Sequence, residues 1–240
     1  MTQSAGSGQA QELGRIERPA AEQFRGRRKL VLVPLVYSPA PDEPEGAAAL
    51  QNYWEQMRTQ VAALENALGG LQRIYHESVT AGEDEGMEQL RAGDQRSHAF
   101  VAGKRDPSTG SGGAVLEATE DIEILLETLD LQRCLMIPMA SPTVASRLQE
   151  WHADANRRRY EHIASRIDET LTEDGMGLLL ISERHQVQFP SDVEVFYVSP
   201  PALDEFRRWL QNWAARQQQA AAQAAANPDD TSEDADSPSP

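Results

Sequence analysis

An apolar segment followed by a Ser-Pro step occurs three times in this chain, at Ser38-Pro39, Ser141-Pro142 and Ser199-Pro200. Short apolar runs are typical of buried strands, and a serine followed by a proline is typical of the first residues of a helix. A helical pattern follows the second and third steps. This pattern of apolar segments and Ser-Pro steps predicts an α/β protein in which polar residues lie at the ends of the strands.

The apolar runs locate the predicted strands. They lie at 30–37, 71–79, 177–181 and 193–198, with a shorter one at 114–117. Residues 134–137 fit either a strand or the end of a helix. The first run is apolar almost throughout, as in strands that are covered on both faces. Because Pro34 cannot donate a ladder hydrogen bond, we expect this strand to lie at an edge or to contain a bulge.

A long helix is predicted between the first two strands, because apolar residues recur there at helical spacing. These residues are Leu50, Trp54, Met57, Val61, Leu64 and Leu68. Gly69 and Gly70 end the helix, since glycine adopts the left-handed C-terminal conformation without strain. Strand, helix and strand form a βαβ unit, whose two strands should be parallel and whose crossover should be right-handed.

Further helices are predicted in the second half of the chain. A helix at 83–103 is interrupted near Gly93. Thr119 is a predicted cap for a helix that should bury Ile122, Leu125, Leu126 and Leu129. From Pro142 a long helix should bury Val144, Leu148, Trp151, Ala155, Ile163, Ile167 and Leu171. These elements predict a single Rossmann-like three-layer α/β domain at 29–219, with a mostly parallel sheet flanked by helices.

The two ends of the chain differ from this domain in composition. Residues 1–28 show no apolar period, and residues 220–240 pass from an Ala/Gln run into an acidic Ser/Pro-rich stretch. We expect both to be disordered tails, because neither has an apolar face to bury.

Charge and cysteine content restrict the class of protein. The formal net charge of −16 argues against nucleic-acid binding, which needs clustered Lys and Arg. The lone Cys134 allows no internal disulfide, which favours a reducing, cytoplasmic compartment. Without an apolar run of membrane-span length, no membrane partner is expected, whereas a homo-oligomer remains open.

Candidate site residues follow from the expected sheet, because ligands of parallel sheets bind beyond the carboxyl ends of the strands. The candidates for proton transfer or metal binding are His76, Glu117, Glu183 and His185. The candidates for ligand binding are Tyr37, Ser38, Ser141 and Ser199, the last two at helix N-termini that can hold anions. We expect the two His rings to share one edge of the sheet, with Glu117 or Glu183 within reach of one ring. No cofactor or metal is identified by these residues.

Local geometry restricts some of these candidates. His76 and Glu77 are consecutive at a strand end and must point to opposite faces, so they cannot form a direct dyad. His185 lies in a connection too short for a crossover helix. His152 is interpreted as a packed or capping residue, and the neighbouring Arg157 and Arg158 as members of a salt-bridged exposed face.

Three functions are compatible with this pattern. The leading hypothesis is a cytoplasmic regulatory domain that binds a small ligand, which could be anionic, at the carboxyl edge of its sheet. The first alternative is a hydrolase-type enzyme that uses the His/carboxylate candidates. The second is a scaffold that pairs with a partner through the Leu50–Leu68 stripe. No nucleotide-binding or nucleophile motif decides among them, since 103–113 is rich in Gly and Ser but lacks the phosphate-loop pattern.

Overall fold

The computed structural model describes residues 26–109 and 113–226 of the chain. This part of the chain forms five strands, six α-helices and one short 3-10 turn. In chain order they are β1 (Arg28–Leu35), α1 (Pro44–Leu68), β2 (Arg73–His76), α2 (Glu83–Gly93), α3 (Gln95–Arg105), η2 (Pro107–Thr109), β3 (Val115–Leu116), α4 (Ile122–Leu135), α5 (Pro142–Thr170), β4 (Met176–Ser182), β5 (Val193–Tyr197) and α6 (Pro201–Ala226). The predicted break near Gly93 separates α2 from α3, and 134–137 includes the end of α4.

The strands form one parallel sheet in the order β3-β2-β4-β1-β5. The predicted fold class, an α/β domain with a parallel sheet, is therefore confirmed. The expected edge position of β1 is wrong, because β1 lies between β4 and β5. Pro34 removes no hydrogen bond from the sheet at this position. The backbone N–H and C=O groups of the even-numbered β1 residues point towards β5, as the bond from Val198 N to Leu32 O shows. Pairing with β5 ends at Leu32, before Pro34. The Pro34 carbonyl accepts a hydrogen bond from the Tyr53 hydroxyl instead.

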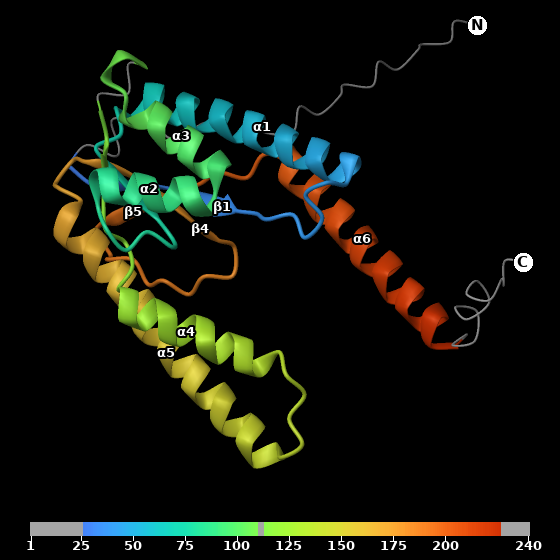
Figure 1. Cartoon of the computed structure of the whole chain (residues 1–240). Coiled ribbons are helices and arrows are strands. Elements are labelled where there is room, and N and C mark those ends of the chain that lie inside the picture. Colours follow the sequence, from blue (N-terminus) through green and yellow to red (C-terminus); the bar gives the residue numbers. More distant parts are fainter. Residues whose placement is uncertain (1–25, 110–112, 227–240) are drawn as a thin grey trace, which may run out of the picture.

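Helices cover the two faces of the sheet unequally (Figure 1). Val31 and Val33 of β1 pack into a core built with α1, α2, α3 and α6. Leu30 and Leu32 face the other way, into a smaller core built with the C-terminal half of α5. The α1 stripe belongs to the larger core, with Leu50, Trp54, Met57 and Val61 all buried. The stripe therefore faces this core, against which the half-buried Leu64 and Leu68 also pack.

The connection between β4 and β5 crosses the sheet without a helix. Both strands are parallel to β1 and lie on either side of it, so residues 183–192 must pass over β1 to join them. Val187 and Phe189 of this segment pack into the same core as Leu30 and Leu32. The segment thus takes the place of the second helix that would otherwise cover this face.

Helices α4 and α5 form an antiparallel hairpin that extends beyond the sheet (Figure 1). The predicted burial along both helices is wrong at several positions, since Ile122, Leu126, Leu129, Val144 and Trp151 are exposed. In α5, Ile163 and Ile167 are buried in the core of the sheet, and Tyr160 and Ala164 pack against it. The first half of α5 packs against α4.

The ordered elements extend slightly beyond the predicted domain. β1 begins at Arg28, and α6 continues to Ala226, seven residues past the predicted boundary at 219. The rest of the two predicted tails, at 1–25 and 227–240, lies outside the described residues. Among the described helices, none combines the length and the apolar character needed to cross a bilayer.

Candidate functional site

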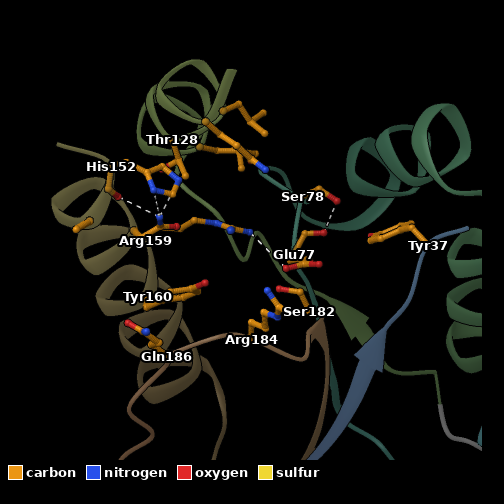
Figure 2. Close-up of a pocket in the computed structure, with 15 residues that line it drawn as sticks. Tyr37, Glu77, Ser78, Thr128, His152, Arg159, Tyr160, Ser182, Arg184 and Gln186 are labelled. Carbon is orange, nitrogen blue, oxygen red and sulfur yellow. Dashed lines mark hydrogen bonds and ion pairs between the residues drawn. The ribbon is translucent and has the colours of Figure 1, made fainter. Parts of the chain in front are cut away.

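A cavity of about 820 Å³ lies between the carboxyl edge of the sheet and the α4–α5 hairpin (Figure 2). We call it the hairpin cavity. Its size falls within the range of small-molecule sites, and its position is the one at which parallel sheets bind ligands. The residues that line it are Tyr37, Glu77, Ser78, Leu125, Thr128, Leu129, Gln132, His152, Ala153, Asn156, Arg159, Tyr160, Ser182, Arg184 and Gln186.

The order of the strands explains why these side chains meet. β4 pairs with β2 on one side and with β1 on the other, so the three strands end next to one another. Glu77 and Ser78 follow β2, Ser182 ends β4, and Tyr37 follows β1. The hairpin then encloses the space beyond these ends, with α5 contributing polar side chains and α4 contributing Leu125 and Leu129.

Glu77 is the buried carboxyl of the cavity, with only 8% of the residue exposed. The Ser182 backbone and hydroxyl hydrogen-bond to it, and Arg159 Nη2 lies 3.6 Å from Glu77 Oε2. Burial nevertheless raises the pKa of Glu77 above its usual range, because the desolvation of the charged form outweighs these favourable contacts. A carboxyl in such a place is well suited to bind a hydroxyl or to exchange a proton with a ligand.

Arg159 is fixed between two acidic side chains. Its Nε atom donates to both carboxylate oxygens of Glu120, at 2.8 and 3.0 Å, and its Nη2 atom donates to the same group. The Glu120 side chain is 1% exposed. Arg159 also lies close to Glu77, so its guanidinium interacts with two carboxyl groups. The positive charge of Arg159 is therefore already neutralised within the protein, without a ligand. Arg159 therefore serves to position the hairpin against the sheet.

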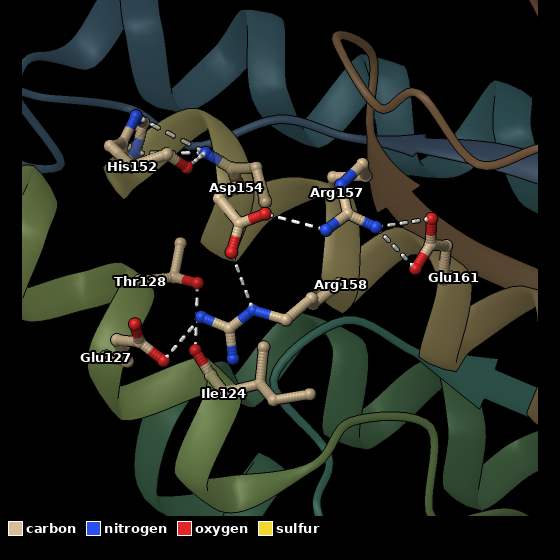
Figure 3. Close-up of polar contacts among 9 residues, drawn as sticks. Ile124, Glu127, Thr128, His152, Asp154, Arg157, Arg158 and Glu161 are labelled. Atoms are coloured by element: carbon tan, nitrogen blue, oxygen red, sulfur yellow. Dashed lines mark hydrogen bonds and ion pairs between the residues drawn. The ribbon is translucent and has the colours of Figure 1, made fainter. Parts of the chain in front are cut away.

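The neighbouring arginines of α5 have a different role (Figure 3). Arg157 pairs with Glu161 at 2.9 Å, and Arg158 pairs with Asp154 at 3.1 Å, as the helical spacing predicted. Arg158 also reaches across to Glu127 of α4 at 2.7 Å. Of these exposed pairs, only Arg158–Glu127 joins the two helices of the hairpin, and none of the residues lines the cavity.

Ser78 has a backbone conformation that non-glycine residues seldom adopt. Its φ is +79°, and Val79 N donates to His76 O at 3.1 Å, which makes Ser78 the third residue of a tight turn. A turn that needs positive φ at this position usually contains glycine. Left-handed geometry costs an L-residue roughly 1–2 kcal/mol, and such strain is common at functional sites. The turn presents Ser78 to the cavity immediately after Glu77.

We expect Ser78→Gly to be more stable than Ser78→Ala by about 1 kcal/mol, because only glycine relieves the positive φ. Both variants lack the hydroxyl, so their difference isolates the backbone. Chemical denaturation of the two variants measures it. An alanine variant that equals or exceeds the glycine variant in stability would show that the turn is unstrained.

His76 does not enter the hairpin cavity. It is completely buried at the end of β2 and alternates with Ile74, which belongs to the core under α1 and α3. Its Nδ1 atom contacts the Glu77 carbonyl, and its Nε2 atom has no hydrogen-bond partner among the described residues. Burial lowers the pKa of His76 to about 4. As the alternation predicted, Glu77 lies on the opposite face, where the cavity is.

His185, Glu183 and Ser199 come together in a different place. They line a cavity of about 240 Å³ beside Tyr197, and Glu183 forms an ion pair with Arg207. Burial lowers the pKa of His185, whose ring centroid is 5.9 Å from that of Phe189. His76 is not among the residues that line this cavity. The shared site that we expected for the two rings stays a prediction.

The remaining candidates have local structural contacts. Glu117 forms ion pairs with Arg73 at 2.9 Å and Arg166 at 3.5 Å. Ser141 caps α5 at the far end of the hairpin, where its hydroxyl accepts from Val144 N. The Ser38 hydroxyl accepts from Ala40 N, and Ser38 lines a third cavity together with Tyr37. Within 26–109 and 113–226 there is no group of three or more His, Cys, Asp or Glu side chains placed to hold a metal ion.

Several residues of the hairpin cavity escaped the sequence analysis. His152 and Asn156 lie in it side by side, with Asn156 Nδ2 3.1 Å from His152 Nε2, although His152 was interpreted as a packed residue. Arg159 could have been found, because it falls on the same helical stripe as the buried Ala155 and Ile163. A charged residue on a buried stripe indicates a buried partner.

Comparisons of this chain with protein-family models, with curated proteins and with solved structures each find no significant match.

Proposed function

We propose that this chain is a cytoplasmic domain that binds a small polar molecule carrying an anionic group in the hairpin cavity. The observation that carries the proposal is a ligand-sized cavity at the carboxyl edge of a parallel sheet, with a buried carboxyl on one side and an uncompensated arginine on the other. The lone cysteine and the acidic composition support the cytoplasmic assignment.

The charges of the lining favour an anionic ligand. Its acidic and basic residues are Glu77, Arg159 and Arg184, apart from His152. Arg159 is already paired with Glu120 and Glu77. Arg184 is exposed and has no ion-pair partner among the described residues, so its charge is available to a carboxylate or a phosphate group.

The uncharged lining suggests the rest of the ligand. Ser78, Ser182 and Tyr37 carry hydroxyl groups at the sheet edge, beside the Glu77 carboxyl, and they suit a hydroxylated or amide-bearing ligand. Leu125 and Leu129 form an apolar wall on the α4 side. The cavity thus fits a molecule with one apolar side, several hydrogen-bonding groups and one negative charge.

An enzymatic use of the same cavity rests on Glu77. A buried carboxyl with a raised pKa in a ligand-sized cavity is the kind of group that acts as a general acid or base. If the chain is an enzyme, Glu77 is the residue to test, ahead of His76, Glu117, Glu183 and His185. Turnover of a bound probe that Glu77→Gln abolishes, while binding persists, would support this alternative.

The binding proposal is tested with a panel of small probes and ligand-observed NMR. The panel pairs each carboxylate or phosphate monoester with its neutral amide or alcohol. We expect binding of hydroxylated anions, and Arg184→Gln should weaken it about 10- to 100-fold, since a charge-assisted hydrogen bond contributes about 1.5–3 kcal/mol. Arg208→Gln, at an exposed position of α6, is the charge-matched control. Equal binding of the anions and their neutral counterparts would contradict the proposed role of Arg184.

A further inference from the structure

A second cavity, of about 360 Å³, adjoins the hairpin cavity at the carboxyl edge of the sheet. We call it the α6 cavity, because residues of α6 line part of it. Both cavities are lined by Tyr37, Ser182 and Arg184, which lie at the ends of the neighbouring strands β1 and β4. A molecule that contacts these three residues in the hairpin cavity is therefore next to the α6 cavity.

The path of the chain explains why two cavities meet at this place. After β1 the chain continues into α1, which packs in the larger core of the sheet. After β4 it continues into residues 183–192, which pack in the smaller core on the opposite face. The chain thus leaves two neighbouring strands towards opposite faces, and in parallel sheets such a divergence opens the crevice in which ligands bind.

The lining of the α6 cavity is more apolar than that of the hairpin cavity. Besides the three shared residues and one ion pair, all its lining residues are apolar: Leu35, Val36, Phe206 and Leu210. The ion pair joins Glu183 to Arg207, so these two charges already neutralise each other. The α6 cavity therefore offers apolar contact, whereas the sheet side of the hairpin cavity carries hydroxyl and carboxyl groups.

Arg184 is the cation that lines both cavities. It is exposed, and it has no ion-pair partner in the part of the chain that the structure describes. A carboxylate or phosphate group bound to Arg184 would lie at the border between a polar and an apolar compartment. Such a border selects ligands whose anionic group joins a polar part to an apolar part.

We propose that the ligand extends from the hairpin cavity into the α6 cavity. Its hydroxyl group lies beside Glu77, its anionic group is held by Arg184, and an alkyl or aryl group attached to the same centre fills the α6 cavity. The inference rests on the proposed function, because it needs an anion bound in the hairpin cavity. It specifies the ligand as an anionic amphiphile, which gains affinity by burying apolar carbon against α6.

Calorimetric titration of the full chain with α-hydroxy carboxylates of increasing alkyl length, from lactate upward, tests this inference. These probes carry a hydroxyl group, a carboxylate and an alkyl chain on one carbon atom. We expect the Kd to fall about two- to fourfold for each added methylene until the α6 cavity is full, because each methylene leaves water for an apolar surface.

Leu210→Trp should remove this gain and leave lactate binding unchanged, because Leu210 lines the α6 cavity and not the hairpin cavity. Leu64→Trp is the matched control. Both leucines are half-buried and pack against the larger core, but Leu64 lines neither cavity. Circular dichroism verifies that each variant is folded. If tryptophan prevents folding, Leu210→Glu serves instead, because a negative charge in the α6 cavity opposes an apolar chain there.

Three results would overturn the inference. Equal affinity along the series would mean that the alkyl chain stays in water. A gain that survives in the folded Leu210 variant would place the chain elsewhere, for example against Leu125 and Leu129 of the hairpin cavity. A gain that Leu64→Trp removes equally would not report on the α6 cavity. In all three cases the proposed function stands if lactate binds and Arg184→Gln weakens that binding, whereas a series without any binding contradicts both proposals.

Discussion

Trp54→Ala is expected to reduce the free energy of unfolding by about 3–5 kcal/mol, the usual cost of removing a buried aromatic side chain. Trp54 is 2% exposed and lies in the larger core of the sheet. Its ring makes edge contacts with Tyr53 and Phe100, whose centroids are 6.1 and 6.0 Å away. Alanine would leave a cavity between α1 and α3 that neither helix can close, because both are held against the sheet.

Urea denaturation followed by circular dichroism measures this change. Tyr197→Ala is a suitable control, because Tyr197 is 66% exposed on the edge strand β5 and should cost less than about 1 kcal/mol. A loss of less than about 1 kcal/mol for Trp54→Ala would mean that α1 does not pack on the sheet as described. The α1 stripe would then be available to a partner.

Lowering the pH from 7 to 4 is expected to cost the protein about 3 kcal/mol of stability through His76 alone. Burial lowers the pKa of His76 from 6.5 to about 4 in the folded state. Between these values the unfolded chain binds a proton that the folded chain does not, so stability rises with pH across this window. The contribution is therefore complete above pH 6.5 and is lost as the pH falls towards 4.

His76→Leu isolates this effect, because leucine fills a similar volume and does not titrate. We expect the stability of the wild type to fall more steeply than that of His76→Leu between pH 6.5 and 4, whatever the absolute stability of the variant. Denaturant titrations at several pH values measure the two slopes. Parallel slopes would show that His76 is accessible to protons in the folded state, contrary to its complete burial.

The fold was predictable to the extent that local pattern determines it. The apolar runs located all five strands, and the helical stripe of α1 proved to be core. The order of the strands was not predictable, because the insertion of β4 between β1 and β2 depends on contacts far apart in the chain. The edge position predicted for β1 from Pro34 was wrong for a related reason. A missing N–H removes a hydrogen bond only where a neighbouring strand is paired, and β5 ends before it reaches Pro34.

The hairpin shows a second limit of sequence patterns. The apolar spacing of α4 and α5 correctly predicted two helices, but a stripe does not reveal whether anything covers it. Ile122 and Trp151 have the pattern of core residues and are exposed in this chain. Their exposure follows from the length of α5, which continues past the edge of the sheet.

The candidate cavity lies where the sequence predicts a site, but only some of its lining residues were predictable. Parallel strands indicated the carboxyl edge, and Tyr37 does line the hairpin cavity there. Because successive side chains of a strand point to opposite faces, only one of the neighbours His76 and Glu77 can line the cavity. Glu77 faces the cavity, whereas His76 faces the core under α1. Arg159 falls on the buried stripe of α5, which indicates a buried partner, but no local pattern shows that α5 lies over the ends of β2 and β4.

Calorimetric titration with the tightest-binding anion of the panel tests the binding proposal most directly, when the full chain is compared with a variant, Ala153→Trp, that obstructs the hairpin cavity. Ala153 is an exposed residue of the lining, so tryptophan there should occupy the cavity without disturbing the core. Ala215→Trp, at an exposed position of α6, is the matched control. We predict that Ala153→Trp abolishes binding, that Ala215→Trp binds as the wild type does, and that both variants keep the wild-type circular dichroism. Undiminished binding to Ala153→Trp would contradict the proposal and place the ligand elsewhere on the protein.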